Sequence, residues 1–187
     1  MNRRDFLFAA GAMLPAAAIT KALAESGHVH HNSGEATAGR RTGQGYMPVH
    51  TPNGWTLPHK MVDGVKEFHL VAEEIEHEFA PGSKAKCWGY NGTTPGPTLE
   101  AVEGDRVRIY VTNRLPEHTS IHWHGLILPA GMDGVSGVTQ PPIQPGETFV
   151  YEFTLQQHGT HMYHPHADEM VQLAMGMMGL FIIHPKD

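Results

Sequence analysis

The chain has 187 residues, a formal net charge of −6 and one cysteine. An acidic chain without a basic stripe is a poor ligand for phosphates, so neither DNA nor RNA is expected as a partner. A single cysteine forms no internal disulfide, and no stretch approaches the ~20 apolar residues of a membrane span. Composition therefore excludes a nucleic-acid-binding, disulfide-stapled or membrane-inserted protein.

Residues 1–24 are typical of an export signal. The segment Asn2-Arg3-Arg4-Asp5-Phe6-Leu7 resembles a twin-arginine motif, an alanine-rich stretch follows, and Ala22-Leu23-Ala24 is a small-X-small cleavage signal. We expect cleavage after Ala24 and export, in a bacterium, to the periplasm.

The remaining residues divide into an arm and one folded domain. Residues 25–60 are rich in Gly, His, Ser, Thr and Pro and have few apolar side chains, which predicts a flexible arm. Residues 61–187 suffice for one hydrophobic core and are too few for two ordinary domains.

The folded domain is predicted to be all-β. Residues 67–72, 106–111 and 148–154 alternate apolar and polar side chains with the period of a strand, and Gly- and Pro-containing turns separate them. The apolar run Gly179-Leu180-Phe181-Ile182-Ile183 reads as the last strand of the domain. Regularly spaced short strands favour a sandwich or a barrel.

Two His-X-His pairs are the most informative feature of the sequence. They are His122-Trp123-His124 and His164-Pro165-His166, about 40 residues apart. On a strand, residues i and i+2 face the same side, so each pair presents two imidazoles to one side and Trp123 faces away. Pro165 cannot donate to a sheet ladder, which places the second pair at a strand end or edge.

The histidines alone leave the metal undecided. One such pair is more often an accident of strand composition than a ligand pair, but pairing of neighbouring strands can bring two together. Imidazole suits copper, zinc, iron and nickel, so the ligand type does not select among these metals.

The motifs together resemble the multicopper oxidases, the family of laccases, ascorbate oxidases and copper-resistance oxidases. The resemblance rests on His122-Trp123-His124-Gly125 and Tyr163-His164-Pro165-His166, on Tyr90-Asn91-Gly92-Thr93-Thr94-Pro95-Gly96-Pro97-Thr98 and on Gly104-Asp105-Arg106-Val107. It covers residues 65–185 and implies a cupredoxin-like Greek-key sandwich and copper as the cofactor. It also implies that His122 binds type 2 copper, that His124 and His164 share one type 3 copper, and that His166 binds the other.

The departures from the family pattern are as informative as the matches. Complete members hold the trinuclear copper centre with eight histidines, and only the first four are present. No Cys-His pair is followed by His and Met, the arrangement of a type 1 site. The resemblance thus implies an N-terminal domain, inactive alone, that supplies half of a site for reducing O2 to water. The rest would come from a C-terminal cupredoxin part or a second chain, and we expect a fragment or split-gene product.

Asp133 is the candidate catalytic residue. It lies nine residues after His124 in Gly131-Met132-Asp133-Gly134, where the resemblance implies an acid near the type 2 copper. Such a carboxylate would orient ligands or bound water and pass protons during oxygen reduction. An Asp-Gly turn accounts for the same residues without any catalytic role.

Two further classes and one binding function compete with the oxidase interpretation. A periplasmic copper-binding or buffering protein would use the same four histidines without enzymatic activity. A cupin-type zinc or iron enzyme would need a Glu shortly after the first pair, which residues 125–129 lack. A copper nitrite reductase would need a Cys where Pro165 stands.

The sulfur-containing residues receive a structural interpretation. Cys87 is predicted to be a buried strand residue, because no His or Met follows it at type 1 spacing. Met170, Met175, Met177 and Met178 can offer thioethers to Cu(I), but core packing explains at least half of this cluster.

Overall fold

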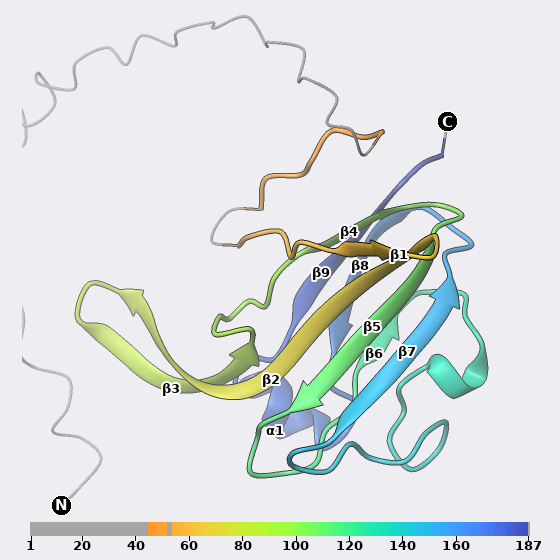
Figure 1. The fold of residues 1–187 in the computed structure, drawn as a ribbon. Helices are drawn as coiled ribbons and strands as arrows, with labels where there is room; N and C mark the ends of the chain where they lie inside the picture. The colour runs from red at the N-terminus through yellow and green to blue at the C-terminus, as the bar shows by residue number, and fades with distance from the viewer. Residues whose placement is uncertain (1–44, 52–53, 187) are drawn as a thin grey trace, which may run out of the picture. The chain divides into compact units, whose positions relative to one another are not determined.

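The computed structural model describes residues 45–51 and 54–186 (Figure 1). The predicted signal, residues 1–24, and residues 25–44 of the predicted arm lie outside the described residues. The described elements, in chain order, are β1 (Lys60–Val62), β2 (Val65–Ala80), β3 (Ser83–Tyr90), β4 (Leu99–Val102), β5 (Arg106–Asn113), β6 (His122–His124), the short 3-10 helix η2 (Ala130–Met132), β7 (Thr148–Thr154), β8 (Gly159–His164), α1 (Glu169–Ala174) and β9 (Gly179–His184).

The first sheet has five strands and contains the three strands with the clearest sequence alternation. Its order is β1-β2-β5-β7, and β3 pairs with β2. Strand β5 runs parallel to β2 and antiparallel to β7. Val107, Ile109 and Val111 of β5 are fully buried on one face, as the period of two requires. The predicted strands at 67–72, 106–111 and 148–154 are confirmed, and β2 continues into a long hairpin with β3 (Figure 1).

The second sheet has four short strands in the order β4-β9-β8-β6. The predicted last strand is confirmed as β9, which lies between β4 and β8. Strand β8 ends at His164, directly before Pro165, because proline offers no N–H for the next ladder bond. The prediction that the second histidine pair lies at a strand end is therefore confirmed.

Trp123 is the central side chain between the two sheets. It is fully buried and packs against Tyr151 of β7, with ring centroids 5.2 Å apart, and against Phe181 of β9 at 6.1 Å. Tyr163 of β8 is also fully buried, and its hydroxyl donates a hydrogen bond of 2.7 Å to the carbonyl of Pro97. Trp123 was predicted to face away from the histidines, and this is confirmed.

The described end of the predicted arm packs against the sandwich. The Tyr46 ring stacks on His184 with centroids 4.1 Å apart, and Leu57 belongs to the core. The Thr56 hydroxyl donates a 2.9 Å hydrogen bond to buried Glu100. This packing differs from the flexible arm predicted for residues 25–60. Isolated apolar residues among polar ones carry no periodic signal, which is why the sequence did not reveal it.

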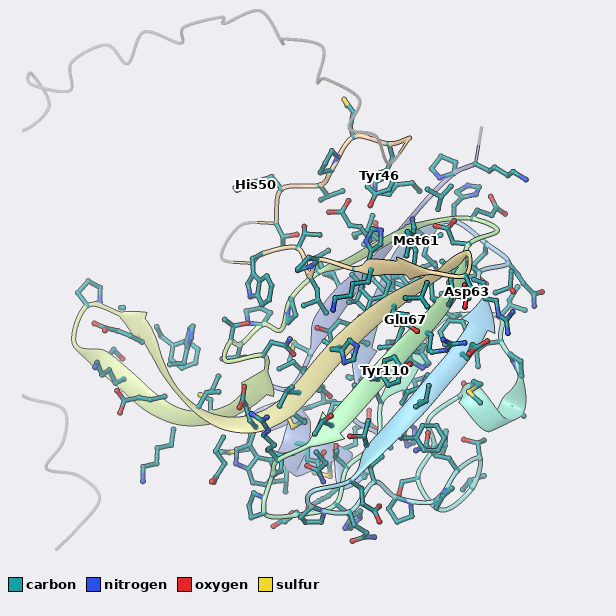
Figure 2. The ribbon with its side chains drawn as sticks, viewed as in Figure 1. Tyr46, His50, Met61, Asp63, Glu67 and Tyr110 are labelled. Carbon is teal, nitrogen blue, oxygen red and sulfur yellow. The ribbon has the colours of Figure 1, made fainter. Side chains whose placement is uncertain are left out.

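The outer face of the five-stranded sheet carries charged and aromatic side chains. Arg108 donates hydrogen bonds to Glu67 and Glu152 at 2.7 and 2.6 Å, and the Tyr110 hydroxyl donates to Glu67 at 3.3 Å. Figure 2 shows Glu67 and Tyr110 on this face. Within the described part of the chain, no helix has the length and apolar character needed to cross a membrane.

Candidate metal centre

The pairing of β6 with β8 brings the two histidine pairs together. In the antiparallel register His122 lies opposite His164, and Trp123 lies opposite Tyr163. Because side chains alternate along a strand, the two aromatic residues enter the core while His122, His124 and His164 share the other face. The ring centroid of His122 lies 5.6 Å from that of His124 and 5.4 Å from that of His164.

His166 reaches the same place from beyond the end of β8. Its ring centroid lies 5.4 Å from that of His122 and 6.4 Å from that of His164. The backbone N–H of Ser136 donates a 3.3 Å hydrogen bond to the His166 carbonyl, which fixes this part of the chain. All four histidines singled out in the sequence therefore converge.

Backbone carbonyls set the protonation of two of these rings. Nδ1 of His122 lies 2.7 Å from the carbonyl oxygen of Asp133, and Nδ1 of His164 lies 2.9 Å from that of Pro165. A carbonyl only accepts, so both Nδ1 atoms carry the proton and donate. The Nε2 atoms of His122 and His164 are left without a proton, the state required of a metal ligand.

The third ring completes a compact donor group. Nδ1 of His124 lies 3.0 Å from Nε2 of His164, so these two nitrogens point at each other. One ring nitrogen from each of His122, His124 and His164 lies within 4.8 Å of the other two. Three imidazoles at such a separation are suited to a transition metal.

Burial keeps one of the rings uncharged. His164 is 4% exposed, and burial lowers its pKa below the ordinary value, with the neighbouring His122 and His124 acting in the same direction. His124 is exposed and His166 half-buried, so the donor group opens to solvent on one side. A histidine group that is open on one side is accessible to a cation from solution.

Asp133 acts on the site first through its backbone. Its carbonyl holds His122, whereas its carboxylate oxygen Oδ1 lies 3.4 Å from the same Nδ1 atom. The turn that places it requires glycine at position 134, where φ is +83° and an added Cβ would lie 1.7 Å from the carbonyl oxygen of Ile121. The predicted role of the carboxylate in proton transfer stays a prediction.

Comparison with known proteins decides the family. The family model described as multicopper oxidase matches residues 71–187. The chain belongs to the multicopper oxidase family. The sequence resemblance is thereby confirmed.

The similar proteins include bacterial copper-resistance proteins. The chain is 43% identical over 136 residues to a copper resistance protein A homolog of Pseudomonas syringae pv. tomato, covering 71% of this chain and 23% of that protein. It is 46% identical over 106 residues to copper resistance protein A of Escherichia coli, covering 57% of this chain and 17% of that protein. The chain thus spans less than a quarter of the length of these relatives.

Solved structures agree on the fold. A multicopper oxidase from Pseudomonas thermotolerans superimposes with a TM-score of 0.64 at 40% identity, covering 66% of this chain and 30% of that one. A multicopper oxidase from Campylobacter jejuni, described as a metallo-oxidase, gives 0.65 at 34% identity and covers 73% of this chain and 30% of that one. The predicted cupredoxin-like Greek-key sandwich is confirmed.

The donor set fits the cofactor of multicopper oxidases. The family uses copper, and the site offers ring nitrogens whose protonation the backbone already sets for metal binding. Imidazole is a preferred ligand of copper, and hydrogen bonds from the opposite ring nitrogen to carbonyls are the usual way to orient it.

Sequence reasoning missed Glu169, the first residue of α1. Its Oε1 lies 3.7 Å from Nδ1 of His164, and its Oε2 lies 3.8 Å from Nε2 of His166. The available signal was an acid three residues after His166. That spacing is too common in surface segments to be informative without the positions of the rings.

The sulfur-containing residues singled out in the sequence lie in different surroundings. Cys87 is a free, buried cysteine of β3, as predicted, and Met177 is fully buried in the core. Met170 is 88% exposed, so packing does not account for it.

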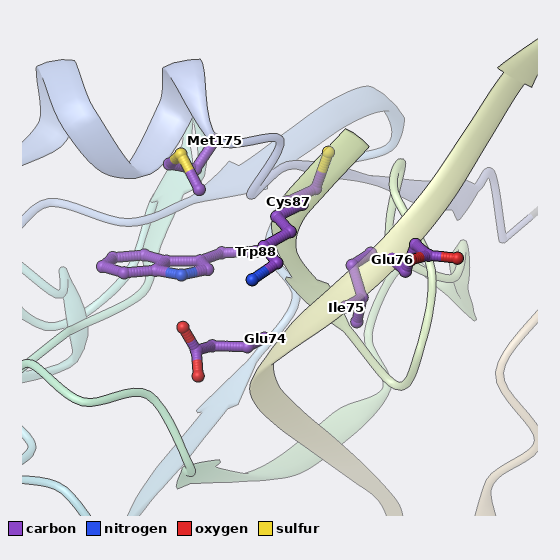
Figure 3. A pocket seen from close by; sticks show the side chains of 7 residues that line it. Glu74, Ile75, Glu76, Cys87, Trp88 and Met175 are labelled. Carbon is purple, nitrogen blue, oxygen red and sulfur yellow. The ribbon is translucent and has the colours of Figure 1, made fainter. Parts of the chain in front are cut away.

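Cys87 and Met175 line a hollow of about 520 Å³ beside the β2–β3 hairpin, where Figure 3 shows Trp88 and Glu74. None of the four histidines lines this hollow.

Proposed function

We propose that this chain is the N-terminal cupredoxin-like domain of an exported multicopper oxidase and contributes half of the trinuclear copper site that reduces O2 to water. The observation that carries the proposal is the 3.0 Å approach of His124 Nδ1 to His164 Nε2 across two paired strands. Ring nitrogens of two histidines 40 residues apart in the chain meet at one point, and the strand-forming character of the two segments does not by itself require this.

The geometry supports a specific distribution of ligands. His124 and His164 face each other and would share one type 3 copper. His122 turns its free Nε2 away from the Asp133 carbonyl and would bind the type 2 copper. His166 stands farther from His164 and would bind the second type 3 copper. Bound copper supplies the one-electron chemistry that oxygen reduction requires.

The remaining ligands are proposed to come from a C-terminal cupredoxin part or a second chain. His124 is exposed and His166 half-buried, so their rings are accessible to such a partner. The chain spans under a quarter of the relatives' lengths. Its single cysteine, Cys87, is not followed by His and Met at the spacing of a type 1 copper site. The isolated chain is expected to have no oxidase activity.

Asp133 is proposed to hold and transfer protons beside the type 2 position. Replacing it with Asn keeps the backbone carbonyl that holds His122 and removes only the carboxylate. In an enzyme reconstituted with the C-terminal part, Asp133→Asn should slow oxygen reduction and leave copper content unchanged. Loss of copper from this variant would instead assign the carboxylate a purely structural role.

Export to the periplasm completes the proposal. It rests on the twin-arginine pattern at Arg3 and Arg4 and on the small-X-small signal ending at Ala24. Periplasmic fractionation of cells expressing the chain, with Arg3 and Arg4 replaced by Lys as the control, tests it. Equal periplasmic accumulation of both forms would contradict this route.

The direct test of the metal site is copper titration of the purified chain, followed by electron paramagnetic resonance. Alanine at His122 and at His164 should each abolish most specific copper uptake. His158→Ala is the matched control, because His158 is an exposed histidine that is paired with Glu103 and is not one of the four histidines. Unchanged copper stoichiometry in the His122 and His164 variants would overturn the site.

A stand-alone copper-binding or buffering protein is the second candidate. It is favoured by the convergence of His122, His124 and His164 within one chain, without ligands from elsewhere. Oxygen consumption separates the two functions. Activity on adding a C-terminal cupredoxin part supports the oxidase, whereas copper binding without oxygen consumption in that mixture supports the buffer.

A further inference from the structure

We infer that Glu169 is a metal ligand and that, with His166, it gives the chain by itself a second ion position, next to a first one at which His122, His124 and His164 hold a single ion until the remaining ligands of the proposed trinuclear site are supplied. The inference rests on the proposed copper function of the four histidines and adds an oxygen donor to them. The ligand would be a divalent first-row cation, with Cu(II) as the ion to test.

The separations between the Glu169 carboxylate oxygens and the two ring nitrogens are too long for hydrogen bonds and are compatible with a shared ion. Oε2 lies 3.8 Å from Nε2 of His166, and Oε1 lies 3.7 Å from Nδ1 of His164. Hydrogen bonds between such atoms are about 2.7–3.2 Å long. A nitrogen and an oxygen that bind one ion at about 2.0–2.2 Å each lie at most about 4.3 Å apart. The separation of Oε2 from Nε2 therefore accommodates an ion between them.

The carboxylate is available for this role. Within the described residues, no side chain or backbone N–H donates a hydrogen bond to Glu169, and its only ion-pair partners are the two histidines. Nδ1 of His164 already donates to the Pro165 carbonyl, so that ring needs no acceptor from Glu169. An acceptor without a donor, facing two imidazoles, is suited to a cation.

The start of α1 holds Glu169 in place. Gln172, one turn further along, is fully buried and donates a 2.9 Å hydrogen bond to the His118 carbonyl. The Thr119 hydroxyl donates a 2.7 Å hydrogen bond to the side chain of the same Gln172. These bonds tie α1 to the segment that leads into β6, so Glu169 is fixed relative to the strand that carries His122.

The second position is distinct from the first. Nitrogens of His122, His124 and His164 form one group within 4.8 Å, and His166 is not part of it. Side chains of His166 and Glu169 are 37% and 41% exposed, which lets water complete the coordination. One imidazole with one carboxylate favours Cu(II) or Zn(II) over Cu(I), because hard oxygen donors disfavour the soft reduced ion.

This arrangement has a consequence for assembly. In the proposed half-site, the position at His166 depends on imidazoles from another part of the protein. A carboxylate already in place lets the chain hold an ion there before those imidazoles arrive. Glu169 therefore distinguishes a chain that binds two ions by itself from one that binds a single ion.

The test is isothermal titration of the purified, metal-free chain with Cu(II), read together with electron paramagnetic resonance. The unaltered chain should bind two ions with different affinities. Glu169→Gln should weaken the second ion by about tenfold or more and leave the first unchanged. His166→Ala should remove the same second ion, and the double variant should lose no more than His166→Ala alone.

Glu103→Gln is the matched control. Glu103 pairs with the exposed His158, whose Nδ1 lies 2.9 Å from the Glu103 carboxylate, and neither residue belongs to the proposed site. Circular dichroism of each variant checks folding, and glutamine keeps the size of this half-exposed side chain. Two-ion binding with unchanged affinities in Glu169→Gln would overturn the inference while the histidine site stands. Unchanged binding in the His122 and His164 variants would overturn the proposed function instead.

Discussion

The two sheets of this domain divide the work between scaffold and chemistry. The five-stranded sheet contains the long strands β2, β5 and β7, and its outer face carries charged residues paired with one another. The four-stranded sheet has strands of three to six residues, and two of them, β6 and β8, carry three of the four histidines. The five-stranded sheet contributes much of the buried area, whereas the four-stranded sheet orients the histidine side chains.

The short sheet depends on the long one for its position. Strand β6 has three residues, and one of them, Trp123, inserts between Tyr151 of β7 and Phe181 of β9. The neighbouring histidines face away from this core because side chains alternate. The backbone positions of these histidines are therefore set by the core beneath them. Variants that affect one sheet and spare the other test this dependence.

The largest effect is expected from Trp123→Ala. Removing a fully buried Trp that contacts both sheets leaves a cavity and should cost about 3–5 kcal/mol of unfolding free energy. Urea denaturation followed by circular dichroism measures it. Val150→Ala, on the partly exposed face of β7, is the comparison and should cost about 0.5 kcal/mol or less. Equal losses in both variants would contradict the central position of Trp123.

A smaller stability effect with a specific loss of copper is expected from Gly134→Ala. An added Cβ would meet the Ile121 carbonyl and move Asp133, whose own carbonyl holds His122. We expect a loss of about 1–3 kcal/mol and weaker copper binding in titration. Gly137→Ala is the control, because its φ is also positive, at +76°, but nothing lies within 4 Å of the added atom. Copper affinity lowered equally in both would refute the contact argument.

A still smaller effect is expected on the outer face of the five-stranded sheet. Arg108→Met removes the side chain that joins Glu67 and Glu152, and ion pairs at a protein surface, here partly buried, contribute only modestly to stability. The melting temperature should fall less than in Gly134→Ala, the difference should shrink at high salt, and copper binding should not change. Weaker copper binding in this variant would show that the two sheets are not functionally separate.

The smallest effect is a pH dependence of stability in the metal-free chain. Burial lowers the pKa of His164, so below about pH 6.5 the unfolded chain takes up a proton that the folded chain resists. Stability should therefore be full above pH 6.5 and decline as the pH falls toward the lowered pKa. Melting temperatures measured over this pH range should change less with pH in His164→Gln than in the unaltered chain.

His59 provides the counterpart at the other sheet. Burial and the nearby Lys66 lower the pKa of His59, whose ring packs on Phe68 of β2. His59→Gln should also flatten the pH profile, and the two effects should add because the residues are in different regions. A profile unaffected by either variant would exclude both histidines as its source.

The sequence by itself determined four of the strands, the two histidine pairs and the family. Alternation in β5 and β7 gave their positions because one face of each strand is buried, and a buried face imposes a period of two. The four histidines were recognisable because their i, i+2 spacing places two rings on one side of any strand. Local rules such as these need no knowledge of distant neighbours.

Only the tertiary structure decided how those residues meet. The register that sets His122 opposite His164, the carbonyl of Asp133 that orients a ring, the packing of Tyr46 and Leu57, and the place of Glu169 depend on contacts between distant segments. Such contacts follow from how the two sheets pack around Trp123, a property of the whole domain. The spacing of residues along the chain does not indicate how the two sheets pack.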